Sequence, residues 1–117
     1  MPVKHSQDIE SVAVAGGVGV TKKTLISLAE APNFEMRCFI IQPGGNMPRH
    51  TNTVEHEQYV LTGRARICIG EEEFDVRPGD VVFIPAGLPH WYQNSGTDVF
   101  QFICVVPNKP DTITLVS

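Results

Sequence analysis

The stretch GDVVFIPAGLPHWYQN, residues 79–94, carries the strongest structural signal in the chain. Its apolar part, residues 81–84, follows the turn residues Pro78-Gly79-Asp80 and ends at Pro85-Ala86-Gly87. A short apolar run between two turns is typical of a strand that is covered on both faces. We therefore expect residues 81–84 to form a strand between two sheets.

Turn residues recur at short intervals on both sides of this stretch. They are Pro43-Gly44-Gly45, Thr62-Gly63, Gly70-Glu71, Arg77-Pro78-Gly79-Asp80, Pro85-Ala86-Gly87 and Ser95-Gly96-Thr97-Asp98. The segments between them are about one strand long, and none has a sustained helical period. This spacing predicts an all-β sandwich or barrel rather than alternating strands and helices.

Two further patterns support an all-β fold. In residues 64–69, Ala65, Ile67 and Ile69 share one apolar face of the expected strand. The residues between them, including Cys68, form the other face, which we expect to be exposed to solvent. Residues 71–76 continue the alternation, which predicts a hairpin that turns at Gly70-Glu71. Residues 99–106 are almost all apolar and predict another strand covered on both faces.

Length and composition indicate a single globular domain over residues 1–117. A chain of 117 residues with 42% hydrophobic and 19% charged residues can bury one ordinary core. Cys38, Cys68 and Cys104 are odd in number and form no Cys-x-x-Cys pair, so neither a disulfide framework nor a thiolate zinc site is expected. Reduced cysteines fit a cytoplasmic protein.

The charge pattern and the amino-terminal region argue against a nucleic-acid-binding protein and against a membrane protein. The net charge of −4 is spread along the chain without a dense basic cluster, so we expect no nucleic-acid partner. The apolar run at residues 12–20 is interrupted by glycines and too short to span a bilayer, and it lacks a signal-peptide pattern. We therefore expect no membrane association. Residues 16–19 are rich in glycine but lack the strand-turn-helix context of a dinucleotide-binding motif, so we expect them to form a flexible loop.

Three of the four histidines fall where turns and strands alternate most regularly. His50 precedes the expected strand at residues 57–62, His56 opens it, and His90 follows the turn at residues 85–87. A barrel brings strand ends together in its mouth, and three imidazoles can bind a transition metal with a position left open. The alternative for any single histidine is an ordinary structural side chain.

The spacing of these residues resembles the two sequence motifs of the cupin superfamily. The segment Gly44-x5-His50-x-Asn52-x3-His56-x6-Gly63 is similar to the first motif, G-x5-H-x-H-x3-E-x6-G. The segment Gly79-x5-Pro85-x-Gly87-x2-His90-x3-Asn94 matches the second motif in full, which by chance has a frequency on the order of 10⁻⁷ per starting position. The resemblance implies a double-stranded β-helix, or jelly-roll, barrel over about residues 21–106, with peripheral segments before and after it.

The resemblance also implies a ligand set for one divalent transition metal. By position, the ligands are His50, Asn52, His56 and His90. His56 replaces the usual glutamate, as in small cupins with an all-histidine site, and Asn52 replaces a histidine with a weak, neutral amide donor. Imidazole ligands narrow the ion to iron, manganese, nickel, copper or zinc. Two alternatives are a three-histidine site with an additional open position, and a turn-capping Asn52 beside a site that has lost its metal.

Strand parity suggests further pocket residues. If His56 and His90 point inward, Gln58 and Tyr92 do so as well, which makes these two the candidate catalytic groups. The alternative is ordinary hydrogen bonding inside a barrel. Candidate pocket residues are Arg37, Met47, Phe102 and Cys104. Phe102 and Cys104 share a face of their strand; they either line the pocket or, as the favoured alternative, fill the core. Arg37 is expected at a solvated edge of the sheet. The alternative is that it faces the lumen of the barrel, with an acidic substrate as its partner.

These expectations lead to competing functions. The first is a metal-dependent enzyme acting on a small organic molecule, with dioxygenase-like, isomerase or lyase chemistry; three neutral histidines resemble the ligands of thiol and flavonol dioxygenases of the superfamily. The second is a module that binds or senses a small ligand or a metal without turnover, and the third is a metal-free structural cupin. The resemblance also implies a homodimer formed through edge strands.

Overall fold

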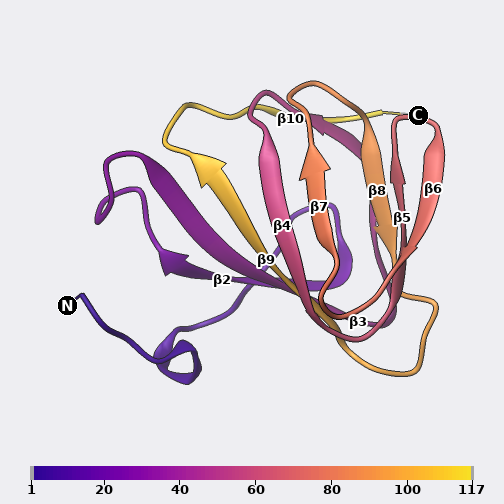
Figure 1. Ribbon diagram of the computed structural model, residues 1–117, viewed down its shortest axis with the longest axis horizontal. Coiled ribbons are helices and arrows are strands. Elements are labelled where there is room, and N and C mark those ends of the chain that lie inside the picture. Colours follow the sequence, from indigo (N-terminus) through magenta and orange to yellow (C-terminus); the bar gives the residue numbers. More distant parts are fainter. Residues whose placement is uncertain (1, 117) are drawn as a thin grey trace.

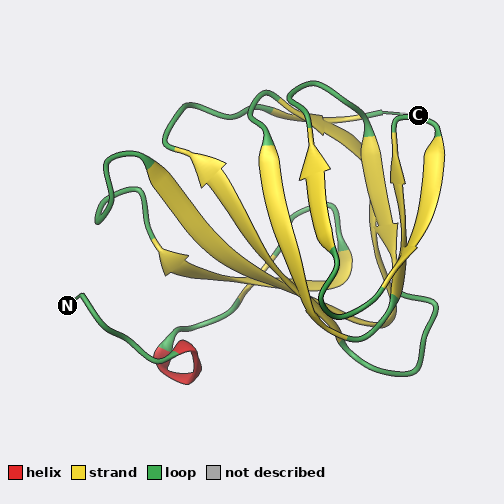
Figure 2. Cartoon of the chain, in the orientation of Figure 1, coloured by secondary structure: helices red, strands yellow, loops and turns green. Residues whose placement is uncertain are grey.

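The computed structural model describes residues 2–116 and is almost entirely β (Figures 1 and 2). One 3₁₀ turn, η1 (Ser6–Asp8), precedes the strands. The strands are β1 (Val12–Ala13), β2 (Val18–Ile26), β3 (Phe34–Asn52), β4 (His56–Thr62), β5 (Ala65–Ile69), β6 (Glu72–Val76), β7 (Val81–Ile84), β8 (His90–Gln93), β9 (Phe100–Pro107) and β10 (Ile113–Leu115). The expectation of an all-β chain is confirmed.

The strands form one antiparallel sheet that curls around an interior (Figure 1). Its main path runs β6-β5-β8-β3-β9-β4-β7, while β2 and β10 attach to β3 and β1 attaches to β2. The path ends at β6 on one side and at β7 on the other, so these two strands are the edges of the curled sheet.

The long strand β3 joins the two halves of the curled sheet. Residues 34–41 pair with β9, whereas Asn46, Met47 and His50 pair with β8. The sequence predicted a turn at Pro43-Gly44-Gly45, but the structure has a bend within a continuous strand. A Cβ on Gly45 would lie 2.6 Å from the carbonyl oxygen of Val18, so the chain passes here only because no side chain is present.

Asn94 fixes this bend from the inside of the protein. Its side chain is fully buried, and Nδ2 donates to the carbonyl oxygens of Ile41 and Asp98 at 2.9 Å each. Its backbone N–H donates to the carbonyl oxygen of Gly45 at 3.0 Å. The asparagine of the second motif thus has a structural role, because it satisfies backbone groups where the strand bends.

Alternating residues of the strands build the core. On β9, Phe100, Phe102, Cys104 and Val106 are buried, and on β4 the inward positions are His56, Gln58 and Val60. Burying one large aliphatic or aromatic side chain stabilises a fold by roughly 1.5–3 kcal/mol. The interior of the barrel is therefore mainly an apolar core, which includes polar side chains near the start of β4.

The structure contradicts the predicted environments of β7 and Cys68 and confirms the predicted hairpin. Strand β7 is covered on one face only, because it lies at a sheet edge: Val81 is 77% exposed, whereas Ile84 is 1% exposed. Cys68, expected on a wet face, is buried. The hairpin between β5 and β6 is confirmed, with Ile69 opposite Glu72 and a left-handed φ of 63° at Gly70 that suits the tight turn.

Both terminal segments pair within the chain. Val12 lies opposite Lys22 in the β1–β2 pair, and Leu115 lies opposite His50 in the β10–β3 pair. The expected loop at residues 16–19 is a short turn at Ala15 and Gly16, closed by a hydrogen bond from the N–H of Gly17 to the carbonyl oxygen of Val14, and β2 already starts at Val18. Within residues 2–116, no helix is long and apolar enough to cross a bilayer.

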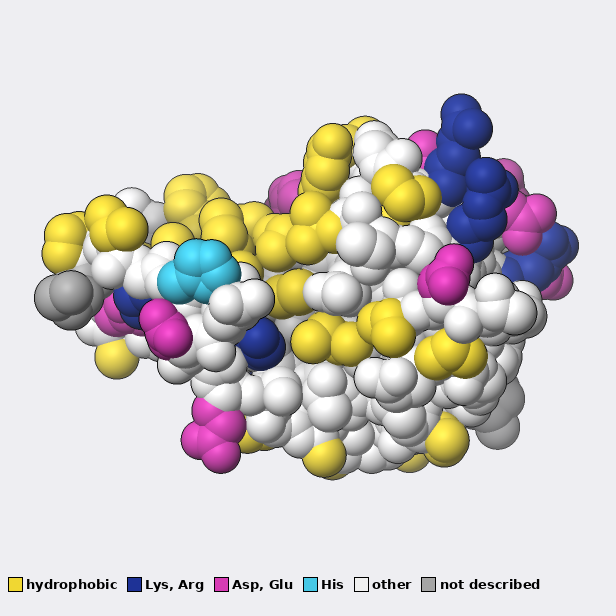
Figure 3. Space-filling model, turned by 90° about the horizontal axis from the view of Figure 1, so that it is seen from below, with side chains coloured by type: hydrophobic (Ala, Val, Ile, Leu, Met, Phe, Trp, Pro, Cys, Tyr) yellow, Lys and Arg dark blue, Asp and Glu magenta, His cyan; other side chains and the backbone are white. Residues whose placement is uncertain are grey.

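Side chains are distributed unevenly over the surface. Figure 3 shows hydrophobic groups over much of this face, including the end that carries the amino-terminal segment, and a concentration of Lys and Arg at the opposite end. Exposed apolar residues in the first third of the chain include Val3, Val18 and Phe34. On β5 and β6, Arg66 forms ion pairs with Glu73 and Asp75 at 3.0 Å each.

Candidate metal centre

A small cavity of about 90 Å³ lies among strands β2, β3, β4, β8, β9 and β10. It is lined by Val14, Ala15, Lys22, Arg37, Phe39, Met47, His50, Asn52, His56, Gln58, His90, Tyr92, Phe102, Ile113 and Leu115. The structure thus brings the residues named from sequence to one place, except that Cys104 lies just behind the lining, with Sγ 3.2 Å from Nδ1 of His56. A cavity of this size holds several water molecules or a small ligand.

Strand pairing places the three histidines close together. His50, near the end of β3, is directly opposite His90 at the start of β8, and their ring centroids are 4.2 Å apart. His56 opens β4, with its ring centroid 5.8 Å from that of His90. All three side chains are buried.

Hydrogen bonds at Nδ1 fix the orientation of two of these rings. Nδ1 of His50 lies 2.8 Å from the carbonyl oxygen of Pro48, and Nδ1 of His90 lies 2.9 Å from that of Leu88. A carbonyl oxygen only accepts, so Nδ1 carries the hydrogen and Nε2 keeps its lone pair. Supporting bonds of this kind are typical of metal-binding histidines.

Asn52 is oriented by an acidic residue from the carboxyl-terminal segment. Its Nδ2 donates to Oδ2 of Asp111 at 2.9 Å, and Oδ1 of Asp111 accepts from the backbone N–H of Thr53 at 2.8 Å. A carboxylate can only accept, so the amide of Asn52 must turn its nitrogen outward and its oxygen toward the cavity.

Three acceptor atoms around the cavity are left without partners. Within residues 2–116, Nε2 of His56, Nε2 of His90 and Oδ1 of Asn52 are buried and accept no hydrogen bond. A buried polar atom without a partner costs about 1–3 kcal/mol, so three together need an explanation. A divalent cation would satisfy all three, because Nε2 of His90 and Oδ1 of Asn52 present lone pairs and Nε2 of His56 presents one in the tautomer whose Nδ1 donates to Sγ of Cys104.

The acid–base properties of the histidines fit the same ligand. Burial lowers the pKa of His56 to about 3, with a further contribution from Arg37, and burial lowers the pKa of His90 to about 4. Both imidazoles are therefore neutral near pH 7, as metal ligation requires. In the described part of the chain, no three His, Cys, Asp or Glu side chains already meet as a formed ion site.

Tyr92 and Gln58 lie beside the histidines and contact each other. Nε2 of Gln58 donates to the hydroxyl oxygen of Tyr92 at 2.7 Å. Burial strongly raises the pKa of Tyr92, so its hydroxyl stays protonated. Because its oxygen already accepts from Gln58, the hydroxyl hydrogen is free to donate to a group in the cavity.

The remaining candidate residues form the walls of the cavity. Phe102 lines the cavity and also belongs to the core, so both sequence-based alternatives hold for it. Met47 lies on β3 opposite Tyr92. The default expectation for Arg37 was wrong: its side chain is only 12% exposed and faces the cavity rather than solvent.

Sequence reasoning missed the contributions of the terminal segments. Asp111, Ile113 and Leu115 lie close to the histidines because β10 pairs with the end of β3. Neither the short carboxyl-terminal segment nor the residues around Val14 carry a motif or a sustained period that would have indicated this.

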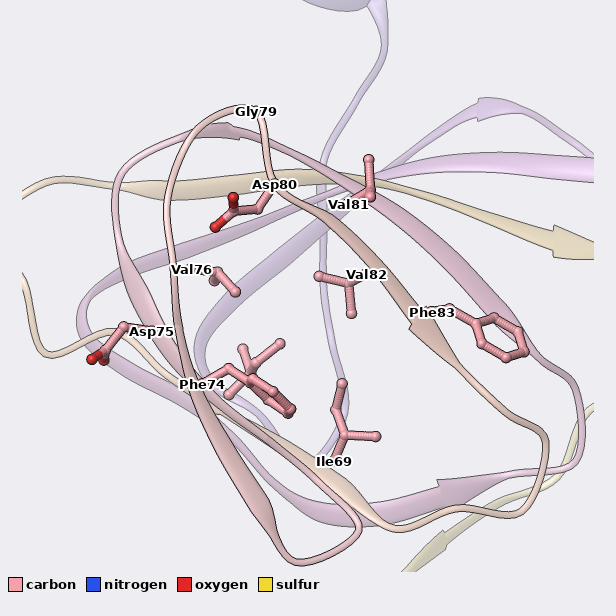
Figure 4. Close-up of a pocket in the computed structure, with 10 residues that line it drawn as sticks. Ile69, Phe74, Asp75, Val76, Gly79, Asp80, Val81, Val82 and Phe83 are labelled. Atoms are coloured by element: carbon pink, nitrogen blue, oxygen red, sulfur yellow. The ribbon is translucent and has the colours of Figure 1, made fainter.

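A second, larger hollow of about 530 Å³ lies between the edge strands β6 and β7 (Figure 4). Figure 4 shows Ile69, Val76 and Val82 in the space between these strands. Its two carboxylates are already engaged, Asp75 with Arg66 and Asp80 with the backbone N–H of Arg77. The hollow therefore lacks the convergent, unpartnered polar atoms of the smaller cavity.

Comparison with known proteins assigns the chain to a family. The cupin domain model matches residues 37–106. The structure of the polyketide cyclase RemF from Streptomyces resistomycificus superimposes with a TM-score of 0.88 and 30% identity, covering 100% of this chain and 87% of that chain. The chain therefore belongs to the cupin family, and the expected jelly-roll architecture is confirmed.

Two curated relatives show how far the likeness extends. A protein of uncharacterised function from Methanocaldococcus jannaschii, MJ1618, is 33% identical over 79 residues, which are 67% of this chain and 57% of that protein. The 1-methylthio-D-xylulose 5-phosphate methylsulfurylase of Rhodospirillum rubrum is 28% identical over 92 residues, 79% of this chain and 58% of that protein. The chain thus spans somewhat more than half the length of these relatives.

Proposed function

We propose that this protein is a metal-dependent cupin enzyme that acts on a small, oxygen-bearing organic molecule. His50, His56, His90 and Asn52 would hold one divalent transition metal ion. The observation that carries the proposal is the set of three buried, unpartnered polar atoms around one cavity: Nε2 of His56, Nε2 of His90 and Oδ1 of Asn52.

The ligand set determines what such an ion would contribute. All four donors are neutral, so a bound ion would keep its full double positive charge and polarise an oxygen atom of the substrate. The identity of the ion stays within the imidazole-binding group of iron, manganese, nickel, copper and zinc.

The chain's own groups supply the rest of the proposed chemistry. Tyr92 donates a hydrogen bond to the substrate oxygen on which negative charge develops, and Gln58 holds the Tyr92 hydroxyl in place. Phe39, Met47 and Phe102 form an apolar wall that limits the access of water. These roles make Tyr92 the candidate catalytic residue and Gln58 a positioning residue.

Among reaction classes, isomerase, lyase or cyclase chemistry is favoured. A neutral tyrosine beside a strongly charged ion suits stabilisation of an enolate-like oxygen, and the neighbour with 30% identity is a polyketide cyclase. The second candidate is dioxygenase-like chemistry, which is supported by the three neutral imidazoles at the site.

A substrate screen with defined variants tests the proposal. Metal-loaded protein is incubated with small hydroxy and oxo compounds in air and under argon, and products are followed by mass spectrometry. We expect turnover that is lost in His56→Ala and equal in both atmospheres; turnover in air alone would favour a dioxygenase. Ligands that bind and return unchanged would contradict the enzyme proposal and support a binding module.

A further inference from the structure

We propose that Arg37 binds the acidic group of the ligand, so that the cavity takes small organic acids with a flat apolar body. The inference deepens the proposed function, because it names the substrate class of the same site. The binding it describes does not itself require the metal ion, which allows the two proposals to be tested separately.

The register of the sheet places Arg37 beside the candidate metal centre. Arg37 on β3 lies opposite Cys104 on β9, and Cys104 lies opposite Gln58 on β4. These three residues thus form a row across three neighbouring strands. Nη2 of Arg37 is 3.5 Å from Sγ of Cys104, and this sulfur is 3.2 Å from Nδ1 of His56.

The guanidinium group of Arg37 is largely buried, and neither its Nε atom nor its Nη2 atom has a strong acceptor. In residues 2–116 its Nε atom is buried without a hydrogen-bond partner, and the thiol of Cys104 is a weak acceptor for Nη2. Glu35 lies 3.4 Å from Nε as an ion pair, without hydrogen-bond geometry. A buried cation in this condition is stabilised by a further anion that accepts from its planar array of donors.

The charges around the cavity favour the same kind of ligand. The described lining contains two cations, Lys22 and Arg37, and no aspartate or glutamate. Glu35 offsets part of the charge of Arg37, and Asp111 is engaged by Asn52 and Thr53. Asn52 and Thr53 are neutral donors, so Asp111 keeps its negative charge behind Asn52. The positive charge of the lining therefore lies on Arg37 and Lys22, and a metal ion would add to it.

A continuous aromatic wall connects Arg37 to Tyr92. The guanidinium carbon of Arg37 lies 5.0 Å from the ring centroid of Phe39, which stacks on Phe102 at 5.3 Å. Phe102 stacks in turn on Tyr92 at 5.1 Å. A ligand with a flat apolar part would lie along this wall, with its acidic group at Arg37 and an oxygen atom near Tyr92 and the histidines.

Binding of salicylate and of its neutral amide, salicylamide, tests the inference by calorimetry. Wild-type protein, Arg37→Gln, Arg37→Lys and the surface control Arg66→Gln are titrated in metal-free and metal-loaded form. We expect wild type and Arg66→Gln to bind the acid about tenfold or more tightly than the amide, because a charge-assisted pair forms only with the acid. Arg37→Gln should reduce the preference to about twofold or less, and Arg37→Lys should retain part of it because the charge is kept.

The outcomes separate this inference from the proposed function. No preference for the acid in wild type, no measurable binding of salicylate, or a preference that survives Arg37→Gln in a folded variant would overturn the role of Arg37, even if the protein binds a metal ion. A preference that depends on Arg37 in metal-free protein would support the inference even if no ion binds. Thermal melts of all variants establish that they are folded, and the partial rescue by Arg37→Lys guards against a loss caused by unfolding.

Discussion

The amide of Asn52 donates from Nδ2 to Oδ2 of Asp111 over 2.9 Å, which turns its Oδ1 atom toward the three histidines. The carboxyl-terminal segment therefore determines how a residue 59 positions earlier in the chain faces the cavity. In the cupin motif this position usually holds a histidine, and here an amide with a dedicated carboxylate partner takes its place.

Removing Asp111 should weaken metal binding without removing any ligand. We expect Asp111→Ala to lower metal affinity by about 10–100-fold, the usual effect of losing a group that orients a ligand. Asp111→Asn should have a smaller effect, because its amide oxygen can still accept from Asn52. Competition with a chelator measures the affinity, Asp98→Asn serves as a surface control, and an unchanged affinity in Asp111→Ala would show that Asn52 is not a ligand.

A substitution of Asn52 itself should raise the metal affinity. Imidazole is a stronger donor than an amide toward late transition metals, so Asn52→His should raise the affinity for zinc or nickel by about tenfold or more. Asn52→Ala should lower it. If both variants bind the ion as wild type does, the site uses the three histidines alone.

The buried histidines predict acid sensitivity of the metal-free protein. The pKa values of His56 and His90 are about 3 and about 4 in the fold, whereas an unfolded histidine has a pKa near 6.5. The unfolded chain therefore binds more protons between these values, and the free energy of unfolding falls as the pH decreases from about 6.5 to about 4.

The expected loss is on the order of 2 kcal/mol per histidine across this window. Urea unfolding at several pH values measures it. His56→Gln should flatten the profile because it removes one of the two titrating groups. A metal-free wild-type protein that is equally stable at pH 7 and pH 4.5 would contradict this prediction.

Tyr92→Phe separates chemistry from metal binding. The variant removes the hydroxyl that faces the cavity and leaves Nε2 of Gln58 with Sγ of Cys104 at 3.7 Å as its remaining partner. We expect a loss of about 1–3 kcal/mol in stability and at least about 100-fold in turnover, with metal content unchanged. Tyr59→Phe, which alters a half-exposed tyrosine of β4, is the matched control. Turnover by Tyr92→Phe at the wild-type rate would exclude Tyr92 from the reaction.

The oligomeric state is a separate prediction. The family resemblance implies a homodimer, and strands β2 and β3 expose apolar side chains such as Val18 and Phe34. Light scattering should give twice the chain mass, and Phe34→Glu should shift the protein toward monomer. A monomer at micromolar concentration would contradict the prediction.

Motif spacing was enough to predict the fold and to name the histidines that the structure brings together. The second motif combines residues with separate physical tasks: Gly87 and Pro85 shape a turn, Asn94 binds the bend of β3, and His90 lines the cavity. Because these tasks fix residue type and distance along the chain, they are visible in one sequence.

Other features depend on contacts that are distant in the sequence. Asp111 reaches Asn52 only through the pairing of β10 with β3, and Arg37 lies inside the sheet rather than at an edge because β2 and β9 both flank β3. Local composition also gave wrong predictions at two places. At Pro43-Gly44-Gly45 it could not distinguish a turn from a bend within a strand, and at β7 it could not show that an apolar strand lies at the edge of the sheet. These outcomes depend on which strands become neighbours.

Element-resolved metal analysis after reconstitution tests the central claim most directly, with wild type, His56→Ala and the exposed control His5→Ala compared side by side. We expect about one divalent transition metal ion per chain in wild type and in His5→Ala, and its loss in His56→Ala. A wild-type protein that holds no ion after reconstitution, or a His56→Ala variant that holds as much as wild type, would contradict it.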